Sequence, residues 1–135
     1  MVVDQEGWGV PGQAGELDES MKPNVYKEED KIEWEPHPLN RNVKLKLLLT
    51  KKDDAVEITA LLATIPHGET IPEHTHREHD IIYPLRGRGK IWVKGLGDLA
   101  LVPGTLLNVP PETPHKVYKV EEDLLVYDVF SGAIL

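Results

Sequence analysis

From Val43 to the C-terminus the sequence is a succession of short apolar stretches, and this pattern limits the fold more than any other feature. No window in this region keeps apolar residues at positions i, i+3, i+4 and i+7 for three turns without an intruding proline or glycine. Several of the stretches are rich in β-branched residues, which favour extended backbone. The pattern therefore predicts an all-β core.

The expected strands are separated by glycine, proline or acidic residues. "VKLKLLLT" (43–50) alternates apolar and polar residues, "KKDD" (51–54) turns the chain, and "AVEITALLATI" (55–65) resumes an extended segment. The later apolar stretches cover residues 80–85, 90–93, 99–102, 105–109, 115–120 and 124–130. Strands that recur at such short spacing, with turn signals between them, are typical of a β-barrel or β-sandwich.

The length of 135 residues fits one domain with a substantial core. Residues 1–22 combine several glycines with acidic residues and predict a flexible N-terminal tail. Residues 23–42 mix charges with prolines, which indicates an irregular lead-in segment. The β domain is then expected over residues 43–135.

Composition excludes several classes of function. The formal charge of −8 makes general nucleic-acid binding unfavourable, because an acidic chain repels phosphate backbones. No apolar run approaches the roughly 18 residues that span a bilayer, and the N-terminus does not resemble a secretion signal. The absence of cysteine fits a reducing, cytoplasmic location, and it leaves only His, Asp and Glu as metal ligands.

The segment "HTHREHD" (74–80) contains three of the six histidines. If the segment is extended, His74 and His76 point to the same face of a sheet and can bind one ion. A carboxylate a few residues later could approach from the adjacent strand, and the distant His115 could complete the set. Three imidazoles and one carboxylate suit iron, manganese, zinc, nickel or copper as divalent ions.

The segment also resembles the first motif of the cupins, which is G, five residues, H-x-H, three or four residues, E, six residues, G. Here Gly68 is followed by five residues to His74, then by His76, by Asp80 and, six residues later, by Gly87. The spacing matches throughout, with aspartate in place of glutamate. The glycines are expected to permit tight turns.

The second cupin motif, G, five residues, P-x-G, two residues, H, three residues, N, is matched in part. Gly104 precedes Pro110 by five residues, and His115 occupies the histidine position. Glu112 stands where glycine is usual, and Lys119 where asparagine is usual. The resemblance to the family covers about residues 43–130.

The resemblance implies a single antiparallel jelly-roll β-barrel with one divalent transition metal inside. Carried over by position, the metal ligands are His74, His76, Asp80 and His115. A slip of one residue in register would bring in His79 instead of Asp80, because neighbouring residues of a strand face opposite sides. If Asp80 is only weakly bound to the metal, it could leave it and act as a general base.

Lys119 lies four residues after His115 and would share its face in a regular strand. Facing inward, its ammonium group could bind a substrate carboxylate or, without its proton, take part in catalysis. The alternative is a bulge that turns the side chain outward.

The resemblance leaves three functional hypotheses. The first is a metal-dependent enzyme that acts on a small oxygenated substrate, with a dioxygenase preferred and an isomerase or lyase next. The second is a non-catalytic module that binds a sugar or an anion, and the third is a barrel without a site. The expected partners are a small molecule and, since sheet faces or edges commonly pair in this family, a second copy of the chain in a homodimer.

Overall fold

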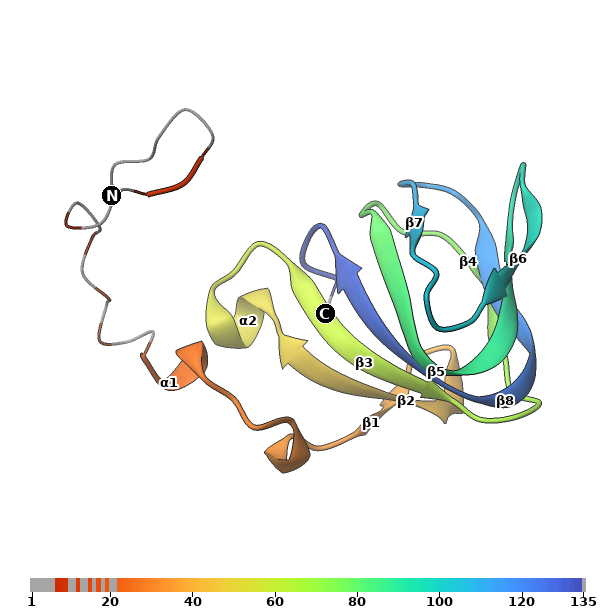
Figure 1. The fold of residues 1–135 in the computed structure, drawn as a ribbon, viewed down its shortest axis with the longest axis horizontal. Helices are drawn as coiled ribbons and strands as arrows, with labels where there is room; N and C mark the ends of the chain where they lie inside the picture. Colours follow the sequence, from red (N-terminus) through yellow and green to blue (C-terminus); the bar gives the residue numbers. More distant parts are fainter. Residues whose placement is uncertain are drawn as a thin grey trace.

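Figure 1 shows the chain as a computed structural model, which describes residues 7–9, 12, 15, 17, 19 and 22–134. The predicted tail, residues 1–22, therefore lies largely outside the described residues. Within the described part, no helix is long and apolar enough to cross a membrane. The remainder of the chain is dominated by strands.

Within residues 22–134 there are three short helical segments: α1 (Lys22–Val25), the 3₁₀ turn η2 (Glu29–Lys31) and α2 (Lys51–Asp54). The strands are β1 (Glu35–His37), β2 (Asn40–Leu49), β3 (Thr59–Ile65), β4 (Ile71–His74), β5 (Asp80–Val93), β6 (Gly97–Leu101), β7 (Leu107–Val109) and β8 (His115–Phe130). All their pairings are antiparallel.

The strands pair in the order β1-β2-β3-β8-β5-β6, while β4 adds to β8 and β7 adds to β5. The pairings do not return from β6 to β1 among the described residues. The long strands β5 and β8 run side by side (Figure 1) and pair along their whole length, from Asp80 opposite Phe130 to Val93 opposite His115. The prediction of an all-β, antiparallel jelly roll is confirmed.

Two pairs of expected strands prove to be single long strands. Residues 80–85 and 90–93 belong to β5, and residues 115–120 and 124–130 belong to β8. Gly87, expected at a tight turn, instead lies inside β5 with a φ of +89°. A Cβ atom there would lie 2.1 Å from the carbonyl oxygen of Asp123, so glycine permits the close approach of the two strands.

The lead-in segment is more regular than its prolines indicate. It contains β1, and β2 begins at Asn40 rather than at Val43. Pro36 lies inside β1 and lacks a backbone N–H, but β1 is an edge strand that, among the described strands, pairs only with β2. An edge strand tolerates proline because one side of its backbone needs no partner.

The interior of the jelly roll is filled by aliphatic side chains and one phenylalanine from β2, β3 and β5–β8. The buried members include Val43, Leu61, Ile65, Ile91, Leu101, Val109, Val117, Leu124, Val126 and Phe130. Asp80 and His115 are also buried, with 4% and 1% of their surface exposed. Burying such groups is unfavourable unless they find partners, so these two residues call for a functional explanation.

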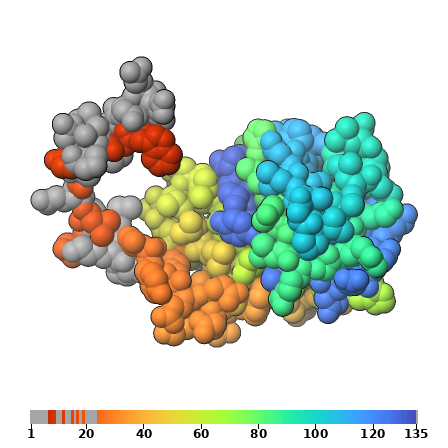
Figure 2. Space-filling model, viewed as in Figure 1, coloured from red at the N-terminus to blue at the C-terminus, as the bar shows by residue number. Residues whose placement is uncertain are grey.

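Side-chain contacts attach the lead-in segment to β2 and α2, and Figure 2 shows this segment, in orange, against their yellow surface. The Lys46 ammonium is buried, lies 3.1 Å from the Glu29 carboxylate and packs over the Trp34 ring. Lys27 donates to the Asp54 carboxylate at 2.7 Å. Asp54 also accepts the backbone N–H of Thr50 at 2.9 Å, which joins the lead-in to the start of α2.

The contacts of Asp54 generate a prediction about pH. Burial alone would raise the pKa of this carboxyl, but the hydrogen bonds from Lys27 and Thr50 lower it below its ordinary value. A lowered folded-state pKa stabilises the protein above the unfolded value of about 3.9, and this contribution disappears as the pH falls through the folded-state pKa. Asp54→Asn is therefore expected to lower the free energy of unfolding by about 2 kcal/mol at neutral pH, measured by urea denaturation.

The difference between wild type and Asp54→Asn should shrink as the pH drops well below about 4. Asp53→Asn is the matched control, because Asp53 is the exposed neighbour in the same helix. A difference that stays constant down to acid pH would contradict the charge-based explanation.

Candidate metal centre

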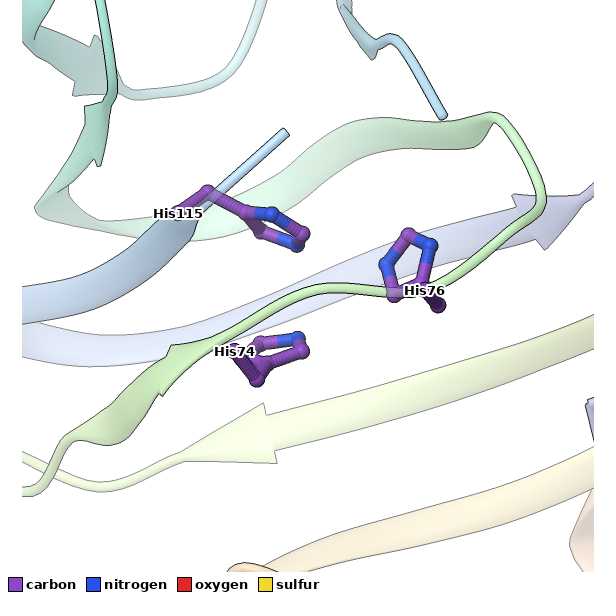
Figure 3. Close-up of side chains that lie close together, drawn as sticks. All are labelled: His74, His76 and His115. Atoms are coloured by element: carbon purple, nitrogen blue, oxygen red, sulfur yellow. The ribbon is translucent and has the colours of Figure 1, made fainter. Parts of the chain in front are cut away.

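Three histidines converge inside the jelly roll (Figure 3). His74 is the last residue of β4, His76 follows in the adjoining loop, and His115 is the first residue of β8. His74 and His115 are direct partners in the β4–β8 pairing. One ligand nitrogen from each of the three rings lies within 4.8 Å of the others.

The Nδ1 atom of each ring faces a backbone carbonyl. The distances are 2.7 Å from His74 to Pro72, 2.9 Å from His76 to Glu78 and 2.8 Å from His115 to Thr113. A carbonyl oxygen only accepts hydrogen bonds, so each Nδ1 carries the proton and donates it. Each Nε2 therefore presents a lone pair, which is the state required of a metal-binding imidazole.

Asp80, the first residue of β5, lies beside two of these nitrogens. Its Oδ2 is 3.3 Å from Nε2 of His76 and 3.4 Å from Nε2 of His115. Both nitrogens and the other carboxylate oxygen, Oδ1, are buried without a hydrogen-bond partner. A carboxylate that faces imidazole lone pairs at this distance is repelled unless a cation or a proton lies between them.

These side chains therefore fit a divalent metal ion. Three imidazole nitrogens converge from β4, the adjoining loop and β8, and the Asp80 carboxylate of β5 lies beside two of them, those of His76 and His115. Their backbone hydrogen bonds set the ring orientations in advance, as the outer contacts of metal-binding histidines commonly do. Iron, manganese, zinc, nickel and copper all accept this donor set.

Electrostatics around the centre follow from burial and from a second acid, Asp128 of β8. Burial alone would raise the pKa of Asp80, but Asp128, His115 and His76 together hold the pKa well below its usual range. Burial and the neighbouring Asp80 charge raise the pKa of Asp128 well above its usual value. Burial lowers the pKa of His74, whereas the Asp80 carboxylate beside His76 raises the pKa of that imidazole.

The two candidates for the fourth ligand, Asp80 and His79, lie in different places in the structure. Asp80 lies at the histidines, as described above. His79 is exposed, and its Nδ1 lies 2.9 Å from Oδ1 of Asn108. The backbone N–H of His79 donates to Ser131, which ties this residue to the segment after β8. His79 is therefore not brought to the centre, and Asp80 is the residue in place.

Lys119, the other expected catalytic residue, lies outside the site. Its side chain is 57% exposed, and its Nζ is 3.8 Å from the Asp98 carboxylate of β6. The backbone of Lys119 has a φ of +51° and lies at an irregularity in the β5–β8 pairing. Lys119 therefore does not share the face of His115, as a regular strand would require. The alternative applies: a bulge breaks the strict alternation of the strand and turns the lysine outward.

A cavity of about 340 Å³ opens beside the histidines. His74 and His76 lie on its wall, which is otherwise formed mainly by apolar side chains such as Leu45, Leu61 and Phe130. A smaller recess of about 50 Å³ lies against Asp80 and His115. The candidate metal centre therefore faces a space that can hold a small organic molecule.

Two polar residues that line this space, Asp128 and His37, are not among the site residues predicted from the sequence. Asp128 lies in the apolar stretch "LLVYDVF", where it alternates with the inward-facing Val126 and Phe130, and that alternation could have identified it. His37 lines both the cavity and the recess, yet it comes from the lead-in segment. No spacing in the sequence connects His37 with the other histidines.

Comparison with solved structures finds several with the same fold. An RmlC-like cupin from Shewanella frigidimarina has a TM-score of 0.69 and 22% identity, over 82% of this chain and 92% of that one. A predicted oxalate decarboxylase from Thermotoga maritima has a TM-score of 0.67 and 22% identity, over 76% and 95%. The DMSP lyase DddQ from Ruegeria pomeroyi has a TM-score of 0.67 and 18% identity, over 76% and 57%.

Sequence comparison adds a family match. A search of curated proteins finds no relative. The profile of the Cupin domain, in contrast, matches residues 61–130, which include all four residues of the candidate centre. This match extends over more than half of the sequence and agrees with the fold of the structures above. The chain belongs to the cupin family.

Proposed function

We propose that this protein is a metal-dependent enzyme that acts on a small oxygenated organic substrate. One observation carries the proposal: the lone pairs of His76 and His115 face the buried Asp80 carboxylate with no hydrogen bond between them. A divalent cation bound there removes this repulsion. The centre also adjoins a cavity of suitable size for a small substrate.

The residues have distinct proposed roles. His74, His76 and His115 would hold the ion through Nε2, with Asp80 as the fourth ligand. The ion would act as a Lewis acid toward a substrate oxygen or, if it is redox-active, would allow chemistry with O₂. Asp80 would accept a proton at a carboxylate oxygen when it is not bound to the metal. The apolar cavity wall would limit the access of water.

Two types of reaction are candidates for this enzyme. A dioxygenase is the first, because three histidines and a carboxylate suit a redox-active metal with one or two positions left for ligands. An isomerase or lyase is the second, and the structural similarity to proteins named as a predicted oxalate decarboxylase and a DMSP lyase favours it. In both candidates the substrate carries oxygen atoms that can bind the metal.

A non-catalytic module that binds a sugar or an anion fits the cavity less well. The wall contains Leu45, Leu61, Ala63, Ile71 and Phe130. A sugar carries hydroxyl groups on all sides, and each needs a polar partner when it is buried. The apolar wall instead favours a substrate with a hydrocarbon portion.

Metal content is the first test. Untagged wild-type protein is expected to contain about one equivalent of a single transition metal by elemental analysis, whereas His76→Ala should bind it at least about tenfold more weakly. His79→Ala is the matched control and should retain the metal, because this exposed histidine contacts Asn108 instead. No metal in the wild type, even after reconstitution, would refute the proposal.

Dependence on oxygen separates the two types of reaction. Reconstituted protein is assayed with a panel of small enolisable carbonyl compounds, in air and under nitrogen, with product and O₂ consumption measured together. A dioxygenase is expected to consume one O₂ per product molecule and to stop under nitrogen. Turnover that persists under nitrogen would exclude the dioxygenase and assign the isomerase or lyase.

We also propose that the chain forms a homodimer through the outer face of β5 and β8. Tyr83, Leu85 and Tyr127 are exposed there by 45%, 42% and 37%, and the two tyrosines are cross-strand partners. Such exposed apolar groups commonly mark protein contacts. Light scattering should give twice the chain mass, and a Tyr83→Glu/Tyr127→Glu double variant should give the monomer.

Leu96→Glu serves as the control for the dimer, because Leu96 is an apolar residue, 71% exposed, at the turn between β5 and β6. This variant is expected to keep the wild-type mass. A monomeric wild type at micromolar concentration would show that this face does not mediate self-association.

A further inference from the structure

His37 is the one polar contribution of the lead-in segment to the cavity wall. It is the last residue of β1 and is half-buried. Its side chain lines both the main cavity and the inner recess, and His74 also lines both. The ring therefore lies where a substrate bound at the metal would pass or rest.

The hydrogen bonding of His37 differs from that of the three candidate ligands. Its Nδ1 accepts the backbone N–H of Leu39 at 2.9 Å, whereas Nδ1 of each ligand histidine donates to a carbonyl. An N–H group can only donate, so Nδ1 of His37 is unprotonated and the ring proton is on Nε2. His37 therefore presents a hydrogen-bond donor where the other histidines present lone pairs.

No acceptor within residues 22–134 receives the proton on Nε2 of His37. The ring makes one hydrogen bond in this part of the structure, and that bond uses Nδ1. Because Nδ1 faces the backbone of Leu39, Nε2 points away from it. An unused donor on the wall of a largely apolar cavity is a group that can orient a ligand.

The position of His37 is held by contacts outside the cavity. The turn after β1 leads into Asn40, whose side-chain amide donates to the Glu69 carboxylate at 3.0 Å and to the Thr70 carbonyl at 2.7 Å. The Asn42 amide donates to the same carboxylate at 3.1 Å. These bonds attach the end of β1 to the loop that leads into β4, the strand that carries His74. The donor is thus pre-positioned relative to the metal centre.

We propose that His37 determines specificity by donating from Nε2 to a carbonyl or carboxylate oxygen of the substrate. The inference rests on the proposed function and names the class of substrate: a small carbonyl or carboxylate compound with a hydrocarbon portion. One oxygen binds at the metal, a second oxygen accepts from His37, and the hydrocarbon portion contacts Leu45, Leu61 and Phe130. His37 is a binding residue in this arrangement and does not ligate the metal.

The test measures binding of 4-methyl-2-oxopentanoate to zinc-loaded protein by calorimetry. This probe has a carbonyl, a carboxylate and a branched apolar end. His37→Phe keeps the ring volume but removes the donor, so it should weaken binding about tenfold or more. His37→Gln restores an N–H donor and should bind within about threefold of the wild type.

The metal content of each variant is measured in parallel. His67→Phe, a change of an exposed histidine outside the cavity, is the control and should bind both metal and probe as the wild type does. Equal affinity of His37→Phe and wild type, or no binding of the probe by metal-loaded wild type, would overturn the inference. Loss of metal from His37→Phe would overturn it too, because His37 would then be a ligand.

The two proposals fail in different ways. A wild type that binds no metal refutes the metal-dependent enzyme, and metal analysis detects this before any probe is added. A wild type that binds both metal and probe, with His37→Phe unchanged, refutes only the role of His37. Normal metal in all variants, with weaker probe binding in His37→Phe alone, supports both.

Discussion

The pairing of β4 with β8 is the interaction on which the site depends. It places His74 directly opposite His115, so two of the three imidazoles meet because their backbones are hydrogen-bonded neighbours. A shift of one residue in this register would turn one of the rings to the other face of the sheet. β8 also pairs with the start of β5, where Asp80 lies opposite Phe130. One long strand therefore organises both the histidines and the acid.

The bulge at Lys119 allows β8 to direct two distant residues, His115 and Asp128, into the interior. The offset between positions 115 and 128 is odd, so a regular strand would place His115 and Asp128 on opposite faces. The positive φ of Lys119 interrupts the alternation, and both side chains then face the interior. The same bulge turns Lys119 toward Asp98. Gly87 provides space on β5 at a different point of β8, where a Cβ atom would meet the backbone of Asp123 and Leu124.

Stability and function are coupled at this centre. Oδ1 of Asp80 and two imidazole nitrogens are buried without hydrogen-bond partners, and this arrangement opposes folding; the proposed cation would offset that cost. A ligand that binds only the folded state stabilises it by mass action. The lead-in segment also shapes the cavity, because it brings His37 to the cavity wall. Contacts of Asn40, Lys46 and Asp54 hold this segment in place.

The sequence by itself determined the all-β class, the position of most strand segments and a local set of candidate ligands, His74, His76 and Asp80. These features depend on short-range rules: residues two apart share a face, and glycine and proline interrupt strands. Only the tertiary structure decided the outward position of Lys119 and the inward positions of Asp128 and His37. A bulge changes which residues face inward without an obvious signal in the sequence, and His37 reaches the cavity only because β1 pairs with β2.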